Sequence, residues 1–457
     1  MAGLVAARQL RAAGRDVVLL ERAPDLGGTV RSARLGDVAI DVGAEAFALT
    51  RPEARSLVHD LDLDGRVVAP RRSDARLVLP DAVAALPPSL LGVPTDLASP
   101  QLLAAVGGDA VRQAEHLDSR PPTPTQADVT LGALVRERFG DAVLARVVAP
   151  VVAGVHASHP DTVQADAVVP GLRAAYEREG SLERGAAALR RASGVPGAAV
   201  AGLVGGMTTL VAALAADLAR TGVRIRSGTQ VQGAERQGIG WQVHTVHGAL
   251  PADELVVAVD AHEAARLLAA LPSVASPLTS ITPGDVAVVA MLVDDPRLDD
   301  DPLGSGALVA QPHPTLRLKA LTHATAKWDW LRQRVGPGRH VLRLSYGLDG
   351  SLGVPLDLLP DTAVADVARL LDVPPTAVTH RRVTHWTRSL VRPTLAHRDA
   401  VQAVGDAVAQ TSGLAVVGAG IGGNGLAGTI AHSLADVGRL TLCTPDPAPQ
   451  LDATMEA

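Results

Sequence analysis

The beginning of the chain combines a helical and an extended hydrophobic pattern. Residues 2–13 place their apolar side chains at the spacing of one helix face, and residues 16–21 form an apolar run that ends in the acid Glu21. A second short extended run follows at 38–42. A helix followed by buried strands is typical of a nucleotide-binding α/β domain, which we predict here.

Later segments interrupt this pattern and then resume it. A proline-rich patch at 121–124 precedes residues 130–146, whose apolar positions recur at helical spacing. Extended runs return in the second half of the chain, and a helical pattern covers 261–271. These runs are 223–226, 230–235, 241–246, 255–259, 286–293 and 341–346. The chain closes with an extended run at 414–418, a glycine-rich loop and a helical pattern at 427–437.

Similar patterns at both ends predict an α/β fold with a discontinuous Rossmann-like domain. That domain comprises residues 1–75, 201–275 and 401–457. A mainly helical insertion at 76–200 and a substrate-domain β-sheet at 276–400 interrupt it. We place the cofactor in the discontinuous domain and the substrate in the insertions.

The composition narrows the class of function. A chain of 457 residues that is 47% hydrophobic can build several cores, and its formal net charge of −6 is spread along the sequence. We therefore predict no nucleic-acid partner. The single cysteine, Cys443, excludes an intramolecular disulfide and a cysteine-based metal site. His156 and His159 stand beside Pro160 without further ligands, so we predict no metal site.

The sequence favours a cytoplasmic protein. The helical pattern at 2–13 carries two arginines and lacks a cleavage site, unlike a signal peptide. The longest uncharged run, 195–216, is close to membrane length, but five glycine and proline residues within it favour a strand, a turn and a helix. Peripheral membrane contact is compatible with this sequence.

A glycine and an acid at a fixed spacing give the first indication of a cofactor. In dinucleotide-binding folds a glycine-rich turn meets the pyrophosphate, and an acid after the next strand holds the ribose. Gly3 and Glu21 match the last glycine and that acid, eighteen residues apart where ~20 is expected. We expect the strand and glycines that normally precede them to be encoded upstream of Met1. Taken alone, the pair is equally compatible with a chance helix and a buried strand.

Two further glycine-rich stretches strengthen this interpretation. Glu21 is followed by LGGTVR at 26–31 and DVGAE at 41–45, where glycines let the backbone approach a cofactor closely. Residues 416–426 combine a strand with a glycine-rich loop that leads into a helix. About thirty residues follow, too few for a second complete nucleotide domain, so we expect this loop to complete the first site.

Together these segments resemble the flavin amine-oxidase superfamily, whose members begin with a dinucleotide turn and end with a glycine-rich flavin loop. Residues 131–141 and the sequence APVVAGVHA at 149–157 look like the substrate-domain signature of its bacterial protoporphyrinogen/coproporphyrinogen oxidases. The segments at 205–210 and 384–397 fall in that family's order. The resemblance covers nearly the whole chain.

The resemblance implies an FAD-binding domain with an inserted α+β substrate domain and a helical, membrane-proximal subdomain. Glu21 would hold the adenosine ribose, and Val231 would meet adenine through its backbone. Trp386 would lie near the flavin, although a core position is equally compatible with the sequence. The cofactor-binding residues predicted in this way are Gly3, Glu21, Arg22, Gly27, Gly28, Thr29, Gly43, Ala44, Glu45, Ala46, Val231, Trp386, Ala419, Asn424, Gly425 and Leu426.

The implied activity is oxidation of a porphyrinogen to its porphyrin in haem biosynthesis, with O2 as acceptor and H2O2 as product. Coproporphyrinogen III is the preferred substrate and protoporphyrinogen IX the alternative. The flavin performs the redox chemistry, so no catalytic side chain is singled out. Substrate propionates require cations, for which Arg71, Arg72 and Arg76 are candidates, although surface solvation accounts for them better. A downstream haem-pathway enzyme is a compatible partner, and the oligomeric state stays open.

Two other functions remain open. An amine oxidase or a carotenoid desaturase would share the cofactor segments and differ in the inserted domain. A non-catalytic flavin- or ligand-binding protein is compatible with the missing first glycines. The sequence also departs from the residues usual in the porphyrinogen oxidases at His156, His159 and Asp260.

Overall fold

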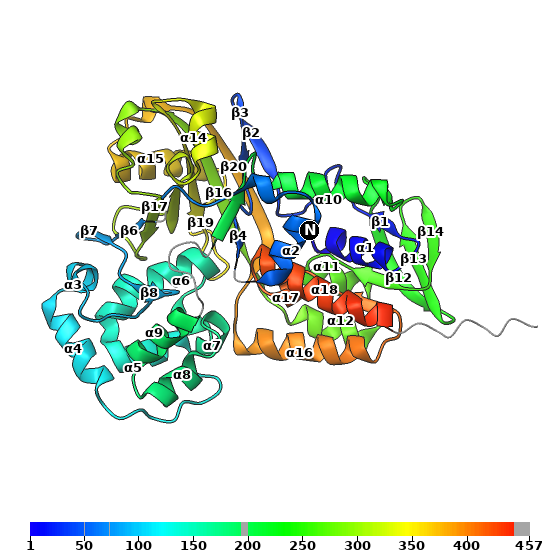
Figure 1. Cartoon of the computed structure of the whole chain (residues 1–457), viewed down its shortest axis with the longest axis horizontal. Helices are drawn as coiled ribbons and strands as arrows, with labels where there is room; N and C mark the ends of the chain where they lie inside the picture. The colour runs from blue at the N-terminus through cyan, green and yellow to red at the C-terminus, as the bar shows by residue number, and fades with distance from the viewer. Residues whose placement is uncertain (50, 73, 193–199, 443–457) are drawn as a thin grey trace, which may run out of the picture.

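The two ends of the chain lie together in one α/β lobe. A computed structural model describes residues 1–49, 51–72, 74–192 and 200–442. Helix α1 (Ala2–Ala12) packs along α18 (Leu426–Leu442), the last helix described (Figure 1). Buried Ala2 and Ala6 of α1 share an apolar cluster with Val437 of α18, because small side chains let two helices approach closely. The predicted discontinuous α/β fold is confirmed.

Two pairs of short parallel strands belong to this lobe. Strand β1 (Val18–Leu20) pairs with β11 (Arg224–Arg226), and β15 (Leu255–Val257) pairs with β21 (Leu414–Val416). All three residues of β21 are buried, as expected for a strand covered on both faces. These strands confirm four predicted extended runs, and each is shorter than predicted. Helix α10 (Thr208–Arg220) begins within the uncharged run at 195–216 and leads to β11.

An antiparallel meander extends the α/β lobe. It consists of β12 (Val231–Gln237), β13 (Gly240–Thr245) and β14 (Gly248–Ala252). Trp241 on β13 is 1% exposed, and its Nε1 donates a hydrogen bond to the Gly413 carbonyl at 3.0 Å, directly before β21. This contact attaches the meander to the parallel strands. Three further helices complete the lobe: α11 (Ala261–Leu267), α12 (Pro272–Thr279) and α16 (Leu395–Ala409).

A seven-stranded sheet forms a second lobe, at the upper left of Figure 1. Its order is β20 (Val378–Val391), β16 (Pro283–Asp294), β19 (Arg339–Tyr346), β18 (Ala320–His323), β17 (Gly306–Val309), β6 (Ala75–Val78) and β7 (Val83–Ala85). Helix α15 (Leu359–Leu371) packs on it through Leu359, Ala363 and Val367. The strands predicted at 286–293 and 341–346 are confirmed. Strand β7 and most of β6 come from the segment at 76–200 predicted to be mainly helical.

Segments from the start of the chain connect the two lobes. The hairpin β2 (Ser32–Leu35) and β3 (Val38–Asp41) packs with its buried Val38 and Ile40 against β16 and β19. Strand β10 (Val200–Leu203) pairs with both β4 (Phe47–Ala48) and β5 (Val67–Val68). Helix α2 (Pro52–Asp60) contacts α18. Through these contacts the residues after Glu21 lie between the α/β lobe and the seven-stranded sheet.

A helical lobe occupies the lower left of Figure 1. Its helices are α3 (Pro100–Val106), α4 (Gly108–Asp118), α5 (Leu131–Val143), α6 (Ala149–His156), α7 (Ala165–Val168), α8 (Leu172–Glu179) and α9 (Leu182–Ala192). The helix predicted at 130–146 is confirmed as α5, which the Thr130 hydroxyl caps by accepting a hydrogen bond from the Ala133 N–H. A π-helical turn at Leu144–Val148 joins α5 to α6.

The helical stretch Leu131–His156, which is kinked at Gly140 (φ +81°), is long and apolar enough to cross a membrane by length and composition. Within its most apolar window, 61% is buried inside the protein, and core helices of other folds pass the same test. The stretch is therefore weak support for membrane contact. Of the uncharged run at 195–216, residues 200–216 form the predicted strand, turn and helix, whereas residues 195–199 and Cys443 lie outside the described residues.

Candidate cofactor and substrate site

A large cavity of about 2290 Å³ lies where the lobes meet. Its walls come from α1, β1, the meander, the carboxyl-terminal loop, the seven-stranded sheet and the end of α6. Pockets for one drug-sized ligand usually measure ~300–1,000 Å³. The cavity is therefore larger than a site for one such ligand.

Two helix amino termini point at this cavity. Met1, Ala2 and Gly3 line it from the first turn of α1, and Gly425 and Leu426 line it where α18 begins. The first turn of each helix carries backbone N–H groups without partners in the helix and the positive end of the helix dipole. An anionic pyrophosphate fits between two such termini.

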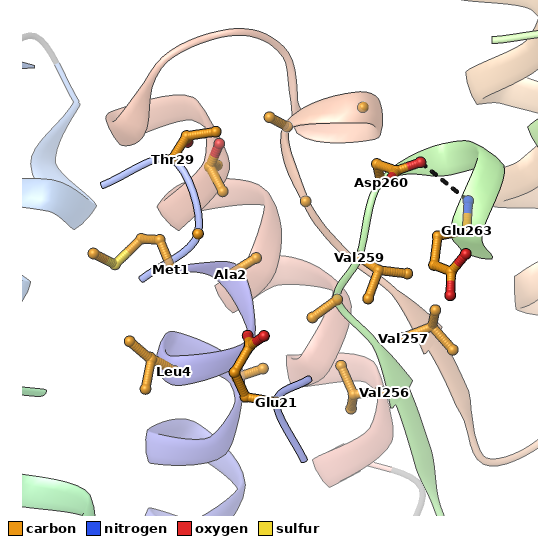
Figure 2. Close-up of a pocket in the computed structure, with 18 of the residues that line it drawn as sticks. Met1, Ala2, Leu4, Glu21, Thr29, Val256, Val257, Val259, Asp260 and Glu263 are labelled. Carbon is orange, nitrogen blue, oxygen red and sulfur yellow. Dashed lines mark hydrogen bonds between the residues drawn. The ribbon is translucent and has the colours of Figure 1, made fainter. Parts of the chain in front are cut away.

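Glu21 follows β1 directly at the edge of the cavity. Its backbone N–H donates to the Arg226 carbonyl at 3.0 Å, and its Oε1 accepts a hydrogen bond from the Ala23 N–H at 2.8 Å. Figure 2 shows the carboxylate turned toward the first turn of α1. Among the described residues Oε2 has no hydrogen-bond partner, so it is free to accept one from a ligand hydroxyl.

The glycine segments after Glu21 pack backbone against backbone. Gly27 has φ +108°, a conformation that residues with a side chain rarely adopt. A Cβ on Gly43 would lie 1.8 Å from the Thr29 carbonyl oxygen, and the Ala44 N–H donates to that same oxygen at 3.2 Å. Both segments line the cavity. Glycine at 43 is therefore required by a contact between two main chains.

The carboxyl-terminal loop is fixed to the end of β20. Asn424 accepts a hydrogen bond from the Val391 N–H at 3.0 Å and donates from Nδ2 to the Val391 carbonyl at 2.6 Å. The short helix α17 (Ala419–Gly422) begins the loop, and His397 Nε2 lies 2.9 Å from the Gly420 carbonyl. The side chain of Asn424 thus holds the loop in place.

Trp386 on β20 packs in an apolar cluster and also lines the cavity, so it meets both alternatives that the sequence left open. Its Nε1 donates to the Val42 carbonyl at 2.9 Å, and its ring packs with the apolar cluster beneath the β2–β3 hairpin. The Arg31 guanidinium lies 5.9 Å from the ring centroid. The half-buried ring also lines the cavity.

Fifteen of the sixteen predicted cofactor-binding residues line this one cavity. Ala46 does not line it; it packs against the apolar cluster around Val38 and Trp328 instead. Val231 lies at the start of β12, and its carbonyl accepts a hydrogen bond from Arg266 at 3.0 Å. The individual contacts assigned to these residues stay predictions, while their convergence on one cavity is observed.

A half-buried charge cluster beside Gly43 was not predicted. The Glu45 carboxylate forms ion pairs with Arg343 and Lys327, and Arg343 also donates to the Gly43 carbonyl at 2.7 Å. Asp41 accepts hydrogen bonds from the Met207 N–H, and burial raises its pKa to about 6. Glu45 therefore ties the glycine segment to the seven-stranded sheet. Only the folded chain brings together residues so far apart in sequence.

The three arginines considered for substrate propionates lie elsewhere. Arg71, Arg72 and Arg76 do not line the cavity. Arg71 and Arg72 both form ion pairs with Asp301, whose side chain is 3% exposed. Arg71 and Arg72 are thus held by a buried carboxylate. Solvation at the surface, which the sequence favoured for them, therefore does not describe them fully either.

The three departures from the porphyrinogen-oxidase pattern have local partners or a place in the cavity wall. Asp260 caps α11 by accepting a hydrogen bond from the Glu263 N–H at 3.0 Å (Figure 2). His159 accepts one from the Asp161 N–H at 3.3 Å. His156 lines the cavity, and its buried Nε2 has no hydrogen-bond partner among the described residues. Within the described ranges, no group of three His, Cys, Asp or Glu side chains could hold a metal.

Part of the cavity separates the two pairs of parallel strands. Among the described residues, β1 pairs only with β11 and β15 only with β21. Residues of β1 and β15 both line the cavity. Unpaired strand edges offer N–H and C=O groups for a further extended segment. The cavity volume thus includes space between two strand edges in addition to room for ligands.

Comparison with known sequences assigns the fold to a family. The family described as flavin-containing amine oxidoreductase matches residues 1–430. The chain belongs to this family. The family's flavin, usually FAD, fits the cavity described above because two helix termini, the Glu21 carboxylate and close-packed glycine backbone line one continuous space.

Individual relatives of this flavin oxidoreductase are similar over most of their length. The coproporphyrinogen III oxidase of Mycobacterium leprae is 32% identical over 82% of this chain and 82% of its own. That of Mycobacterium tuberculosis (strain H37Rv) is 31% identical over 93% of this chain and 92% of its own. That of Propionibacterium freudenreichii is 28% identical over 99% of this chain and 92% of its own.

Solved structures show the same fold. The structure of an assigned protoporphyrinogen oxidase from Exiguobacterium sp. 255-15 has a TM-score of 0.84 at 23% identity and covers 96% of both chains. Putrescine oxidase bound to putrescine has a TM-score of 0.67 at 14% identity and covers 96% of both chains. The flavin amine oxidase fold is thus common to proteins that carry different names.

Proposed function

We propose that this flavin oxidoreductase converts coproporphyrinogen III to coproporphyrin III in haem biosynthesis, with O2 as electron acceptor and H2O2 as product. The observation that carries the proposal is the similarity to curated coproporphyrinogen III oxidases at 28–32% identity over 82–99% of the chain. The cavity supports it by continuing past the predicted flavin segments to Val286, Val288, Thr322 and Ser345 of the seven-stranded sheet.

In this proposal the protein binds and positions FAD and the porphyrinogen, and FAD supplies the redox chemistry. When bound, FAD would supply two-electron redox chemistry with O2 as the final acceptor. The amino termini of α1 and α18 stabilise the pyrophosphate, and Glu21 accepts hydrogen bonds from the ribose. The sheet residues orient the porphyrinogen on the remaining wall and exclude water. In this mechanism no side chain has to act as a dedicated acid or base.

We also propose a cytoplasmic location with peripheral contacts to membrane or to a downstream haem-pathway enzyme. The support is limited to the helical lobe, where Leu103 is 51% and Val155 49% exposed. Val155 lines the cavity as well, at the end of α6. A partner bound at Val155 would lie next to the cavity.

The activity is tested with purified protein saturated with FAD. Coproporphyrinogen III is added under air, and porphyrin fluorescence and H2O2 are recorded against free FAD at the same concentration. We expect porphyrin to form well above the free-flavin rate, with H2O2 accumulating in parallel. Porphyrin formation at the free-flavin rate, together with H2O2 production from putrescine, would instead assign the chain to the amine oxidases.

A further inference from the structure

Lys319 is a buried cation on the substrate side of the cavity wall. The residue directly precedes β18 and is 3% exposed. Its main chain is fixed, because its N–H donates to the Ser345 carbonyl and its carbonyl accepts from the Val309 N–H, both at 2.9 Å. Its side chain has no hydrogen bond or ion pair with any residue that the structure describes. Lysine is almost never fully buried without such a partner.

The half-buried cations nearby, in contrast, have a carboxylate partner. Lys327 and Arg343 share the Glu45 carboxylate. Lys319 and Lys327 are the only lysines in a chain with 42 basic residues (Lys and Arg together), and of the two only Lys319 lines the cavity. Burial lowers the pKa of Lys319 to about 7, because nothing nearby compensates its charge. An anionic ligand would supply that missing compensation.

The surroundings of Lys319 are suited to a ligand with an apolar body. Ala320, Thr322 and Ser345 line the same wall, and Val286 and Val288 continue it across the sheet. The end of α6 packs onto β17. His156, at that end of α6, contributes the buried Nε2 without a hydrogen-bond partner described above. The wall therefore combines apolar surface with two unpaired nitrogen groups.

We propose that the Lys319 ammonium binds a carboxylate of the substrate, namely one propionate of the porphyrinogen. This inference rests on the proposed function and adds a specific anchoring contact to it. A carboxylate is the chemical match because it accepts charge-assisted hydrogen bonds and neutralises a buried ammonium. Among the candidate cations, Lys319 is preferred because Arg71 and Arg72 are paired with Asp301 outside the cavity and Arg343 is paired with Glu45.

The test compares Lys319→Met with wild type in the FAD-loaded protein. Methionine keeps the length and apolar character of the side chain and removes the charge. Dissociation constants are measured by porphyrin fluorescence for coproporphyrin III and for its tetramethyl ester in the same detergent buffer. Lys319→Arg tests rescue by charge, and Arg55→Met on exposed α2 controls for the loss of one positive charge. FAD content and Tm are recorded for each variant.

We expect Lys319→Met to weaken binding of coproporphyrin III by about 10–100-fold, the usual effect of losing a charged hydrogen bond. Binding of the ester, FAD content and Tm should stay close to wild type, and Lys319→Arg should recover part of the affinity. Equal losses for acid and ester, or no loss for either, would overturn the role of Lys319.

The same experiment separates this inference from the proposed function. If wild type oxidises coproporphyrinogen III and Lys319→Met binds coproporphyrin III normally, only the lysine contact is wrong. If wild type neither oxidises coproporphyrinogen III nor binds coproporphyrin III, the proposed function fails and the carboxylate contact fails with it. A lowered Tm for Lys319→Met with equal loss of both ligands would assign the lysine a structural role.

Discussion

Gly43→Ala is expected to abolish FAD retention and to lower Tm. The new methyl group would lie 1.8 Å from the Thr29 carbonyl oxygen, so the two main-chain segments would have to separate. Overpacking of this kind typically costs about 1–3 kcal/mol, and more where backbone has to move. Both segments line the cavity, so their separation distorts the wall that the flavin contacts. Absorbance at 450 nm after gel filtration and a thermal melt measure the two effects.

Gly405→Ala is the matched control for this substitution. Gly405 lies within α16, and no atom comes within 4 Å of the position its Cβ would take. Alanine is favoured over glycine inside a helix by about 0.5–1 kcal/mol, so this variant should retain FAD and melt no lower than wild type. Normal FAD content in Gly43→Ala would show that the glycine segments do not form the flavin wall.

Glu21→Gln is expected to weaken FAD binding by about 10–100-fold while the fold is kept. The amide retains the oxygen that accepts the Ala23 N–H, so the turn after β1 survives. It removes the negative charge from the hydrogen bonds to the ribose, and hydrogen bonds to charged groups contribute roughly 1.5–3 kcal/mol. Titration of the apoprotein with FAD, followed by flavin fluorescence, gives the two dissociation constants.

The control for Glu21→Gln is Glu115→Gln, on the exposed surface of α4. It removes the same charge far from the cavity and should leave FAD affinity unchanged. Two identical titrations for Glu21→Gln and wild type would mean that the ribose does not lie at Glu21. A large loss of Tm in Glu21→Gln would instead show that the carboxylate is needed for the fold.

Local patterns account for what the sequence predicted correctly. The helix at 2–13, the strand that ends at Glu21 and the strand at 414–418 each depend on periodicity and on burial of short apolar runs. The glycines of the cofactor segments were recognisable because their spacing follows from a turn that must approach a ligand. The residues that make up each of these patterns lie close together in the sequence. Each pattern can therefore be recognised without knowledge of the tertiary structure.

Contacts between distant segments account for what was missed. Nothing local shows that Glu45 meets Arg343, about three hundred residues later, or that Ala75–Val78 joins a sheet built mainly from the second half of the chain. The contact between Asn424 and Val391 was missed for the same reason, because the two residues are 33 positions apart. The rarity of lysine was a signal within the sequence, because one of the two lysines, Lys319, lines the cavity.

The central claim is that FAD spans the cavity from Glu21 to the carboxyl-terminal loop. A crystal structure of the protein reconstituted with FAD tests it most directly. We predict density that runs from ribose beside Glu21, past the amino termini of α1 and α18, to a ring system between Trp386 and residues 419–426. Saturated protein with an empty cavity, or with flavin bound at another surface, would contradict the account.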